Sequence, residues 1–591
     1  MKHFISFLSL CLVFNIANAQ QSAWKNKVDA SVLAKAEQGK SIDFIIVMKE
    51  QADVSGAKNL KTKEEKGRFV FNTLEKFAQR SQKSILDLLT NAKASFHAFY
   101  LVNAIYTKGD AKLMEQLASR ADVKYLAPNP TTQMQMPLDF QSANELHLRQ
   151  GVEWGIQKIN ADQVWELGYT GQGVVIAGQD TGYDWDHPAI KTKYRGWNGA
   201  TADHNYNWHD AIHSISPLHG DSIISPSLNP CGLDSKVPCD DHSHGTHTMG
   251  TMVGEDNFGN QIGVAPDALW MAARNMERGY GSPTTYIECF EWFLAPTDLN
   301  NKNPNPSKAP HVINNSWGCP EMEGCNPSNW ALMETAINNL RAAGVVVVQS
   351  AGNSGSSCSS IDDAAAIFEG AFSVGASQSN DTIAGFSSRG AVTADGSGRI
   401  KPNVVAPGVG VRSAVLGDGY AAWNGTSMAG PHVAGVVALL ISANPELAGQ
   451  VEMIETIIEQ TAKPMVATQD CGNRSGAEIP NNTYGYGRID ALAAVQKALE
   501  LATDVDSVSK NASIKIFPNP AWEEATLQLT GFYGEVEFTL FNATGQQVQR
   551  LSWDARIVSL KPINLKDLPK GVYFYQLASG GTIKSGKIVK Q

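Results

Sequence analysis

The sequence predicts an α/β fold with a parallel sheet, preceded by a small α+β domain and followed by a small β-sandwich. Strongly apolar segments in the middle of the chain, such as 174–178 and 344–348, predict buried strands that end on polar residues. Parallel strands joined by helices bring such residues together at the carboxyl edge of the sheet. Before this core the chain alternates strand and helix patterns, and after residue 513 it shows short alternating strands separated by turns.

Length and charge narrow the class of protein. With 591 residues the chain is too long for one core, and roughly 100 to 200 residues per domain suggests three or four domains. The net charge is −10, the pI is about 5.8, and no basic stripe is present. We therefore expect no nucleic-acid partner.

The first residues predict export. Lys2 is followed by an apolar run from Phe4 to Phe14, and Ala17-Asn18-Ala19 has the small-x-small pattern of a secretory cleavage site. This run is too short to span a membrane stably, and no later segment is predicted to span one. We expect a signal peptide at 1–19 and a protein without a stable membrane span.

Export makes disulfides possible, and an odd number of cysteines remains after Cys11. Two short loops and one longer connection are the expected bridges: Cys231–Cys239, Cys319–Cys325 and Cys358–Cys471. Cys289 would be the free thiol, and it lacks the glycine turn or neighbouring histidine of a cysteine nucleophile. The first pair lies in a long polar insertion between residues 180 and 244, which could shape a substrate site or be a surface loop.

Residues 20–126 predict a small α+β domain of the type β-α-β-α-β. The expected elements are a strand at 41–48, a helix at 65–93, a strand from Phe99 to Tyr106, a short helix to Leu117 and a strand from Val123 to Leu126. Residues 127–150 are rich in Pro, Gln, Asn and Met without a period, and they predict an exposed processing linker.

Three motifs of the central region place polar residues where catalysis is expected. An apolar strand delivers Asp180 at its carboxyl end, and His244 opens a segment of small residues. The segment 424–435 places Ser427 at the start of a helix too apolar for a surface, where unpaired N–H groups favour an oxyanion. Pro431 lacks the N–H that would bond to the carbonyl of Ser427, and such irregularities tend to mark functional sites.

Together these motifs resemble the subtilisin family of serine proteases, whose catalytic residues also follow the order Asp, His, Ser. The sequence from Tyr183 to Pro188 is most similar to that of the bacillopeptidase F-like branch. The resemblance implies a subtilisin-like three-layer catalytic domain at 151–502 and a ferredoxin-like propeptide at 20–126 that chaperones and inhibits it. It also implies the site: catalytic Asp180, His244 and Ser427, the oxyanion residue Asn353, and the substrate-binding residues Ser316, Trp317 and Gly318.

This resemblance implies a secreted serine endopeptidase that forms an acyl-enzyme and is made as a self-processed zymogen. We expect protein or peptide substrates, the enzyme's own propeptide as a partner, a monomer, and chemistry without a cofactor or catalytic metal. The segment Glu255 to Gln261 carries hard oxygens where many subtilisins hold calcium. Ala189 stands where the family commonly supplies an aspartate ligand, so we favour a polar turn over a structural calcium.

The chain changes character after a helix to about Leu501 and a linker at 503–512. Residues 513–591 predict a β-sandwich and contain Pro518-Asn519-Pro520, a Gly571-Val572-Tyr573 strand and a terminal segment from Gly586 to Lys590. This region resembles the C-terminal sorting domain of the type IX secretion system, which implies that secretion machinery as a partner. It also implies export through the periplasm and outer membrane, to the cell surface or beyond. A carbohydrate-binding sandwich is the alternative.

Two other functions remain open. A metal hydrolase could use the acidic residues and histidines that surround the second motif: Asp240, Asp241, His242, His244 and His247. However, His244 and His247 stand three residues apart, whereas zincin histidines stand four apart. An inactive protease scaffold could instead serve as a surface adhesin or binding module. The residue preferred before the scissile bond is not fixed by the sequence, since Asp362 and Asp363 could face a basic side chain or be solvated acids.

Overall fold

The computed structural model describes residues 24–134, 138–141, 151–220, 225, 227–472, 474–503, 513–530, 535–554, 560–579 and 582–591. The predicted signal peptide at 1–19 lies outside these residues, as do 135–137, 142–150 and 504–512 of the predicted linkers. The chain forms two compact units, Met1–Lys497 and Ala498–Gln591.

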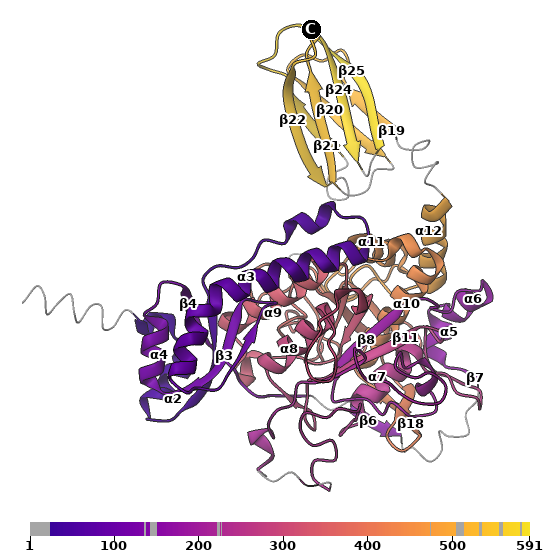
Figure 1. Ribbon diagram of the computed structural model, residues 1–591. Coiled ribbons are helices and arrows are strands. Elements are labelled where there is room, and N and C mark those ends of the chain that lie inside the picture. The colour runs from indigo at the N-terminus through magenta and orange to yellow at the C-terminus, as the bar shows by residue number, and fades with distance from the viewer. Residues whose placement is uncertain are drawn as a thin grey trace, which may run out of the picture. The chain divides into compact units, whose positions relative to one another are not determined.

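A seven-stranded parallel sheet forms the centre of the first unit, as predicted (Figure 1). From edge to edge its strands are β16 (Val404–Pro407), β15 (Phe372–Ser377), β14 (Val346–Ser350), β13 (Val312–Asn315), β8 (Val175–Asp180), β11 (Leu269–Arg274) and β9 (Trp208–Asp210). All residues of β13 and β14 are buried, as expected for a parallel sheet that is covered on both faces.

Helices cover both faces of this sheet and complete a three-layer core. The covering helices are α7 (His244–Val253), α8 (Pro283–Leu294), α9 (Pro327–Ala342) and α10 (Thr426–Ala443). Ile313 and Val347 of the sheet share a hydrophobic cluster with α8 and α9. Gly430 of α10 faces Asn314 and Val348, and successive strand residues point to opposite faces, so α10 covers the other side.

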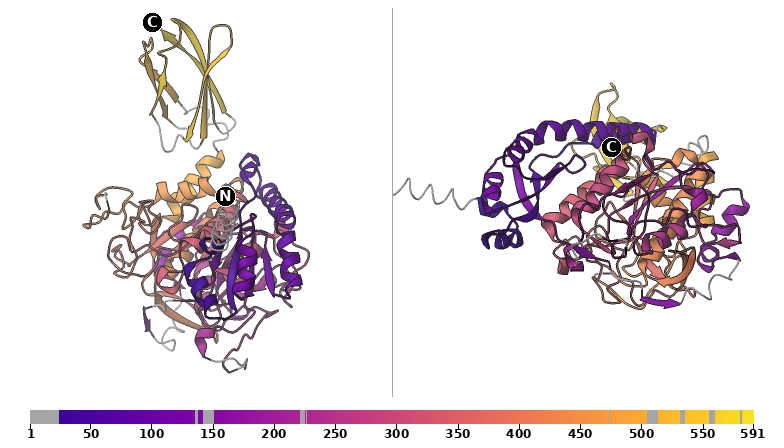
Figure 2. Two further views of the ribbon diagram at one scale, coloured as in Figure 1. Left: turned by 90° about the vertical axis from the view of Figure 1, so that its left-hand side faces the viewer. Right: turned by 60° about the horizontal axis from the view of Figure 1, so that its bottom comes forward.

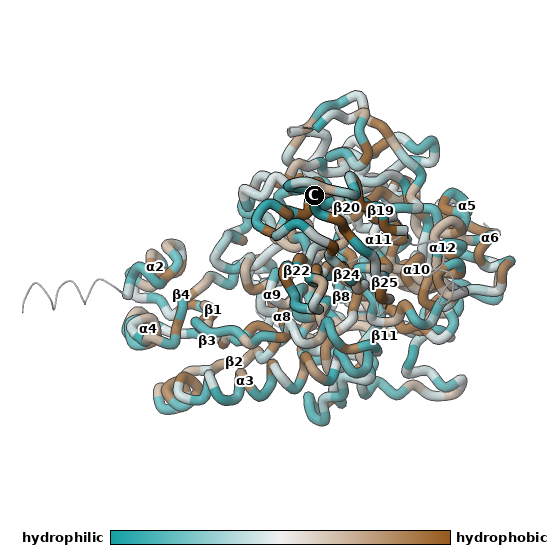
Figure 3. Tube along the Cα trace, turned by 90° about the horizontal axis from the view of Figure 1, so that it is seen from above, coloured by the Kyte–Doolittle hydropathy of each residue, from teal (hydrophilic) through white to brown (hydrophobic). Residues whose placement is uncertain are grey.

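Helix α10 is the most apolar of these helices. Among the described residues it alone is long and apolar enough to cross a membrane, but 94% of it is buried inside the protein. Figure 3 shows hydrophobic residues gathered at α10, whereas hydrophilic and hydrophobic residues alternate along α3 (Lys63–Asn91) of the N-terminal domain. Helix α10 is therefore a core helix, and its first turn lies at the carboxyl edge of the sheet.

The N-terminal domain contains four antiparallel strands, one more than predicted. Its elements are α2 (Ala30–Glu37), β1 (Ile42–Met48), α3, β2 (Phe96–Phe99), β3 (Ala104–Gly109), α4 (Ala111–Ala118) and β4 (Val123–Pro128). The sheet order β2-β3-β1-β4 with this chain order is that of a ferredoxin-like unit. The single strand predicted from Phe99 to Tyr106 is wrong, because the chain turns between β2 and β3, where Asn103 adopts φ +41°.

This domain packs against α8 and α9, and Figure 2 shows it from two further sides. Val70 and Phe71 of α3 belong to the same hydrophobic cluster as these helices. The Leu101 amide donates to the Glu291 carboxylate at 2.7 Å, and the Asn339 Nδ2 donates to the Leu101 carbonyl at 2.7 Å. Apolar burial and directed hydrogen bonds together hold the domain on the core.

Two further parts of the first unit were not predicted in detail. The segment 154–166 forms two short helices, α5 (Trp154–Lys158) and α6 (Ala161–Glu166), separated at Asn160 with φ +59°. The polar insertion between residues 180 and 244 contributes β9 to the edge of the central sheet, so it is more than a surface loop. The three disulfides pair as predicted, and Cys289 is free and buried.

The second unit contains the predicted β-sandwich. One sheet contains β19 (Ser513–Phe517), β20 (Glu524–Thr530) and β23 (Leu560–Asn564). The other contains β22 (Gln547–Asp554), β21 (Glu535–Phe541), β24 (Gly571–Ser579) and β25 (Thr582–Lys590). Leu527 of the first sheet and Phe538 and Leu577 of the second meet in one core.

Candidate active site

Ser427 lies in the first turn of α10 and is 7% exposed. Its Oγ donates to the Ser316 carbonyl at 3.3 Å, and the Ser316 Oγ donates to the Ser427 carbonyl at 3.0 Å. Pro431 accounts for the second bond, because it offers no N–H to the carbonyl four residues before it and Ser316 supplies the donor instead. The helix irregularity therefore ties the backbone of Ser427 to the segment that follows β13.

Asp180 and His244 form a buried pair. Asp180 ends β8, and His244 begins α7, a helix in contact with α10. The His244 Nδ1 lies 2.8 Å from the Asp180 Oδ1, and the two side chains are 0% and 1% exposed. The His244 Nε2 has no hydrogen-bond partner among the described residues. A proton on Nδ1, donated to the carboxylate, leaves Nε2 free to accept another proton.

Asp240 fixes the turn that precedes His244. Its Oδ1 accepts from the amides of His242 and Ser243 at 2.9 and 3.0 Å, and its Oδ2 accepts from the Thr246 amide and hydroxyl at 3.0 and 2.6 Å. The Thr181 hydroxyl also donates to Oδ1 at 2.9 Å. Asp240 thus connects the start of α7 to the end of β8, which sets the distance between His244 and Asp180.

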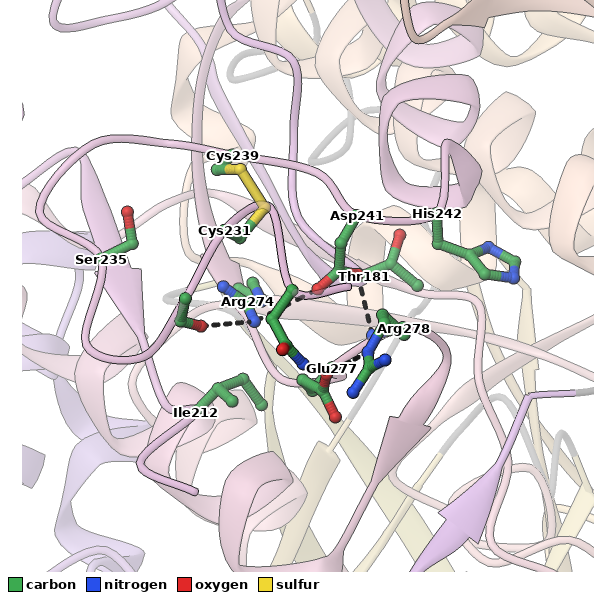
Figure 4. Close-up of polar contacts among 12 residues, drawn as sticks. Thr181, Ile212, Cys231, Ser235, Cys239, Asp241, His242, Arg274, Glu277 and Arg278 are labelled. Atoms are coloured by element: carbon green, nitrogen blue, oxygen red, sulfur yellow. Dashed lines mark hydrogen bonds and ion pairs between the residues drawn. A yellow bond between two sulfur atoms is a disulfide. The ribbon is translucent and has the colours of Figure 1, made fainter. Parts of the chain in front are cut away.

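Arg274 contacts the next residue of the same turn, Asp241 (Figure 4). This fully buried guanidinium lies 3.2 Å from Asp241 and 3.3 Å from Asp210, and it donates to the Gly232 carbonyl at 3.1 Å. The Arg278 amide donates to Asp241 at 2.8 Å. Burial raises the pKa of Asp241 to about 7, although the positive charge of Arg274 lowers it in part. The polar insertion is therefore tied to the turn that carries His244.

The acidic residues and histidines considered as metal ligands point to different partners. Asp240 accepts from the Thr246 amide in the first turn of α7, Asp241 faces Arg274, and the His247 Nε2 lies 3.1 Å from two backbone carbonyls. Burial lowers the pKa of His247 to about 3, so its ring is neutral. In the part of the chain that the structure describes, no three such side chains gather as a metal site.

Asn353 is held by the residue that precedes the serine. Its Oδ1 accepts from the Thr426 amide and from the Thr426 hydroxyl, both at 2.9 Å. Two donors on one side assign the carbonyl oxygen to that side and turn Nδ2 away from it. Asn353 and Ser427 line one pocket, so an amide donor fixed through Thr426 is presented beside the serine.

The predicted binding segment forms a wall of this pocket. Ser316, Trp317 and Gly318 line it together with Asp363, which the sequence left open between pocket and solvent. The Trp317 ring stacks on Tyr286 with the ring centroids 3.8 Å apart and an interplanar angle of 16°. This stacking gives the wall a fixed position.

Part of the predicted linker lies in the same cleft. β5 (Thr132–Gln133) pairs antiparallel with β12 (Tyr280–Gly281), and the Met134 amide donates to the Gly279 carbonyl at 2.8 Å. Gln133 and Met134 line the pocket that contains Ser427. Further along the chain, β6 (Leu138–Gln141) pairs with β18 (Gly419–Asn424), which leads into α10. The protein binds its own chain as an added strand, on an edge that the sequence did not reveal.

The segment Glu255 to Gln261 forms a polar turn whose oxygens accept hydrogen bonds from the chain itself. Asp256 accepts from the Asn260 amide at 3.0 Å, from the Asn260 Nδ2 at 2.7 Å and from the Tyr420 hydroxyl. Arg412, whose side chain is 1% exposed, donates to the Asn260 Oδ1 at 2.5 Å. A guanidinium thus supplies positive charge beside these oxygens.

Ser427 and Asn353 line one pocket, and the buried Asp180–His244 pair lies at the start of α7, which contacts the helix of Ser427. These are the residue types that serine hydrolases use. Residues 171–487 match the Subtilase family, and the chain belongs to this family. Residues 515–591 match the secretion system C-terminal sorting domain. This domain indicates type IX secretion to the cell surface or the extracellular space.

Three curated relatives show how far the similarity extends. Bacillopeptidase F of Bacillus subtilis (strain 168) is 35% identical over 502 residues, which are 80% of this chain and 32% of that protein. Subtilisin E of the same strain is 31% identical over 400 residues, 67% of this chain and 82% of the relative. The alkaline protease of Alkalihalobacillus alcalophilus is 31% identical over 357 residues, 60% and 73% of the two chains. The chain thus spans about a third of Bacillopeptidase F and most of the subtilisin.

Proposed function

We propose that the protein is a secreted serine endopeptidase that is made as a zymogen and processes itself. The observation that carries this proposal is the buried contact of 2.8 Å between Asp180 and His244, in a fold whose neighbouring helix presents Ser427 at a pocket. Membership of the subtilase family and relatives named as subtilisins and proteases support it.

In the proposed mechanism Ser427 attacks the peptide carbonyl while the His244 Nε2 takes the hydroxyl proton. The Ser427 hydroxyl turns for this from the Ser316 carbonyl toward the histidine, and Asp180 holds the ring and stabilises the imidazolium. The tetrahedral oxyanion accepts from the Asn353 Nδ2 and from the Ser427 amide. His244 then protonates the leaving amine, and water hydrolyses the acyl-enzyme by the same sequence of proton transfers.

Substrate binding follows the arrangement of the linker strand. A peptide would add as a strand between Ser316–Gly318 and β12, where Gln133 and Met134 lie in this structure. We assign residues 20–126 to a propeptide that chaperones and inhibits the catalytic domain at 151–502. Occupation of the cleft by the segment that follows the N-terminal domain supports this zymogen role.

Every group in these steps belongs to the chain, so we propose a monomeric enzyme without a cofactor for the chemistry. The oxygens of Asp256 and Asn260 have hydrogen-bond donors in the chain, and Arg412 lies beside them. We therefore propose that this turn holds its shape without calcium.

The alternative is an inactive protease scaffold that serves as a surface adhesin or binding module. A fluorophosphonate probe, applied with and without a chelator, separates the two. The proposal predicts labelling at Ser427 that withstands the chelator and disappears in Ser427→Ala. Loss of labelling with the chelator would favour a metal-dependent site, and absence of labelling would favour the binding module.

A further inference from the structure

The pocket beside Ser427 has a carboxylate in its wall. The pocket lies between the segments Ser316–Gly318 and Ser350–Asn353, and Asp363 lines it together with Ser427. A peptide whose carbonyl carbon reaches Ser427 directs the side chain before the scissile bond into this pocket. The groups that line it therefore select that side chain, an argument that rests on the proposed protease function.

Two glycines leave the carboxylate accessible from the pocket. A Cβ added to Gly318 would lie 2.8 Å from the Asp363 Cγ, and one added to Gly352 would lie 3.2 Å from the Asp363 Oδ2. A side chain at either position would crowd the carboxylate. Asp362, the neighbouring acid, is exposed to solvent and is not part of the pocket lining.

The Asp363 carboxylate lacks a complete set of partners. Its Oδ1 is out of contact with solvent and has no hydrogen-bond partner among the described residues. Burial, together with the charges of Asp362 and Glu323, raises the pKa of Asp363 to about 7, although a hydrogen bond from the Cys319 backbone lowers it in part. Gln133 and Met134, which line the pocket in this structure, are uncharged. A buried carboxylate in this state is stabilised most by a ligand that brings a positive charge.

We propose that Asp363 makes the enzyme cleave peptide bonds that follow lysine or arginine. An ammonium or guanidinium that enters the pocket forms a charge-assisted hydrogen bond with the carboxylate, which a neutral side chain does not replace. A glutamate at the same position would be repelled. The uncharged linker strand leaves Asp363 unpaired, so a cationic substrate gains an interaction that the bound linker lacks.

The test compares kcat/KM on peptides that differ only in the residue before the scissile bond: Arg, Lys, Gln, Leu and Glu. The full chain after its own processing is first titrated with a fluorophosphonate, and rates are measured at pH 8.5, above the pKa of Asp363. We expect Arg and Lys to exceed Leu and Gln by about tenfold or more. A labelled enzyme that prefers Leu or Gln, or shows no preference, would overturn this inference alone, whereas an unlabelled protein would overturn the protease function as well.

The variants Asp363→Asn and Asp362→Asn separate charge in the pocket from charge near it. Asp363→Asn keeps the side-chain shape, and we expect the ratio of Arg to Leu cleavage to fall by about tenfold or more. Asp362→Asn is the matched control and should change this ratio by less than about threefold. Benzamidine should inhibit the unaltered enzyme competitively and more strongly than neutral benzamide, a comparison that needs no variant to fold. Equal inhibition by the two compounds would contradict the role of Asp363.

Discussion

At the residue scale, the site depends on side chains whose orientation is fixed by their neighbours. Thr426 holds the Asn353 oxygen with two donors, and Asp240 connects the turn before His244 to the end of β8. Neither Thr426 nor Asp240 is assigned a part in the proton transfers. Both residues instead fix the positions of groups that take part in the proposed reaction. Such preorganised groups contribute most to catalysis where water is excluded.

Asn353→Ala tests the proposed oxyanion donor. If the Nδ2 bonds the tetrahedral oxyanion more strongly than the ground-state carbonyl, kcat should fall by about 10² to 10³, a range measured in a subtilisin, with little change in KM. The measurement uses active-site-titrated enzyme. Thr426→Val keeps the amide donor to Asn353 and removes the hydroxyl, so it should lose a smaller part of kcat. A normal kcat per labelled site with a lower melting temperature would show that Asn353 only shapes the turn.

The sequence points to residues that belong to local motifs, whereas it left open or did not indicate those that depend on tertiary contact. Asp180, His244 and Ser427 each follow or begin an apolar element, so their positions can be predicted from the chain alone. Asp363 and Arg274 carry no local pattern. Their placement in a pocket wall and behind a turn results from the packing of segments far apart in sequence.

At the scale of elements, α10 combines a core helix with an irregular first turn. Pro431 removes one helical donor, and the Ser316 Oγ replaces it at the Ser427 carbonyl, 3.0 Å away. Ser316 therefore has a structural partner in α10 in addition to lining the pocket. This contact couples the end of β13 to the start of the helix.

Ser316→Ala should lower the free energy of unfolding by about 1 to 3 kcal/mol, because it leaves a buried carbonyl without its donor. Pro431→Ala restores an amide that can donate to the same carbonyl, so the Ser316 substitution should be less harmful in that background. Urea unfolding of both single variants and the double variant, all carrying Ser427→Ala to prevent self-digestion, gives the coupling energy. Strict additivity would contradict the assigned replacement of one donor by another.

The presence of a helix or strand was predicted better than the residues at which it begins and ends. The long apolar strands of the sheet and the periodic helix α3 were predicted, since burial imposes a strong pattern on them. The breaks at Asn103 and Asn160 were missed, because an asparagine in the left-handed region leaves no periodic signal. The pairing of β5 with β12 was missed because the partner lies about 150 residues away.

At the scale of the whole molecule, the contact between the N-terminal domain and the core should depend on pH. Burial raises the pKa of Glu291 to about 8, and the charge of Glu288 adds to this increase. Hydrogen bonds from the backbone of Leu101 and Tyr100 lower the pKa, but by less. If the domain leaves, Glu291 becomes solvated and its pKa returns toward the ordinary value. The protonated carboxyl therefore favours the bound state; this contribution is fully present below the ordinary pKa of a glutamate and is lost as pH rises from there to about 8.

We expect Glu291 to weaken inhibition of the mature enzyme by the separated N-terminal domain by about tenfold between pH 6.5 and pH 9, relative to the Glu291→Gln variant, which cannot ionise there. Burial lowers the pKa of Lys63, which donates to the Ala309 carbonyl of the core, to about 7, and this lysine contributes the opposite trend in both proteins. Burial also lowers the pKa of His97, which contributes the opposite trend only below its ordinary range. Inhibition constants measured on titrated enzyme check this, and an equal pH dependence in the variant would exclude Glu291 as the cause.

The most direct test of the account is the intact mass of the chain produced in a protease-deficient host, with and without Ser427→Ala. Gln133 and Met134 line the pocket of Ser427, and β6 pairs with β18, the strand before the helix that carries Ser427, so the unaltered protein should cut itself at a bond C-terminal to Met134. The Ser427→Ala protein should fold, as judged by its melting temperature, and keep the N-terminal domain covalently attached. Recovery of a Ser427→Ala protein that has been cut at the same bond would contradict the claim that this site hydrolyses peptide bonds in its own chain.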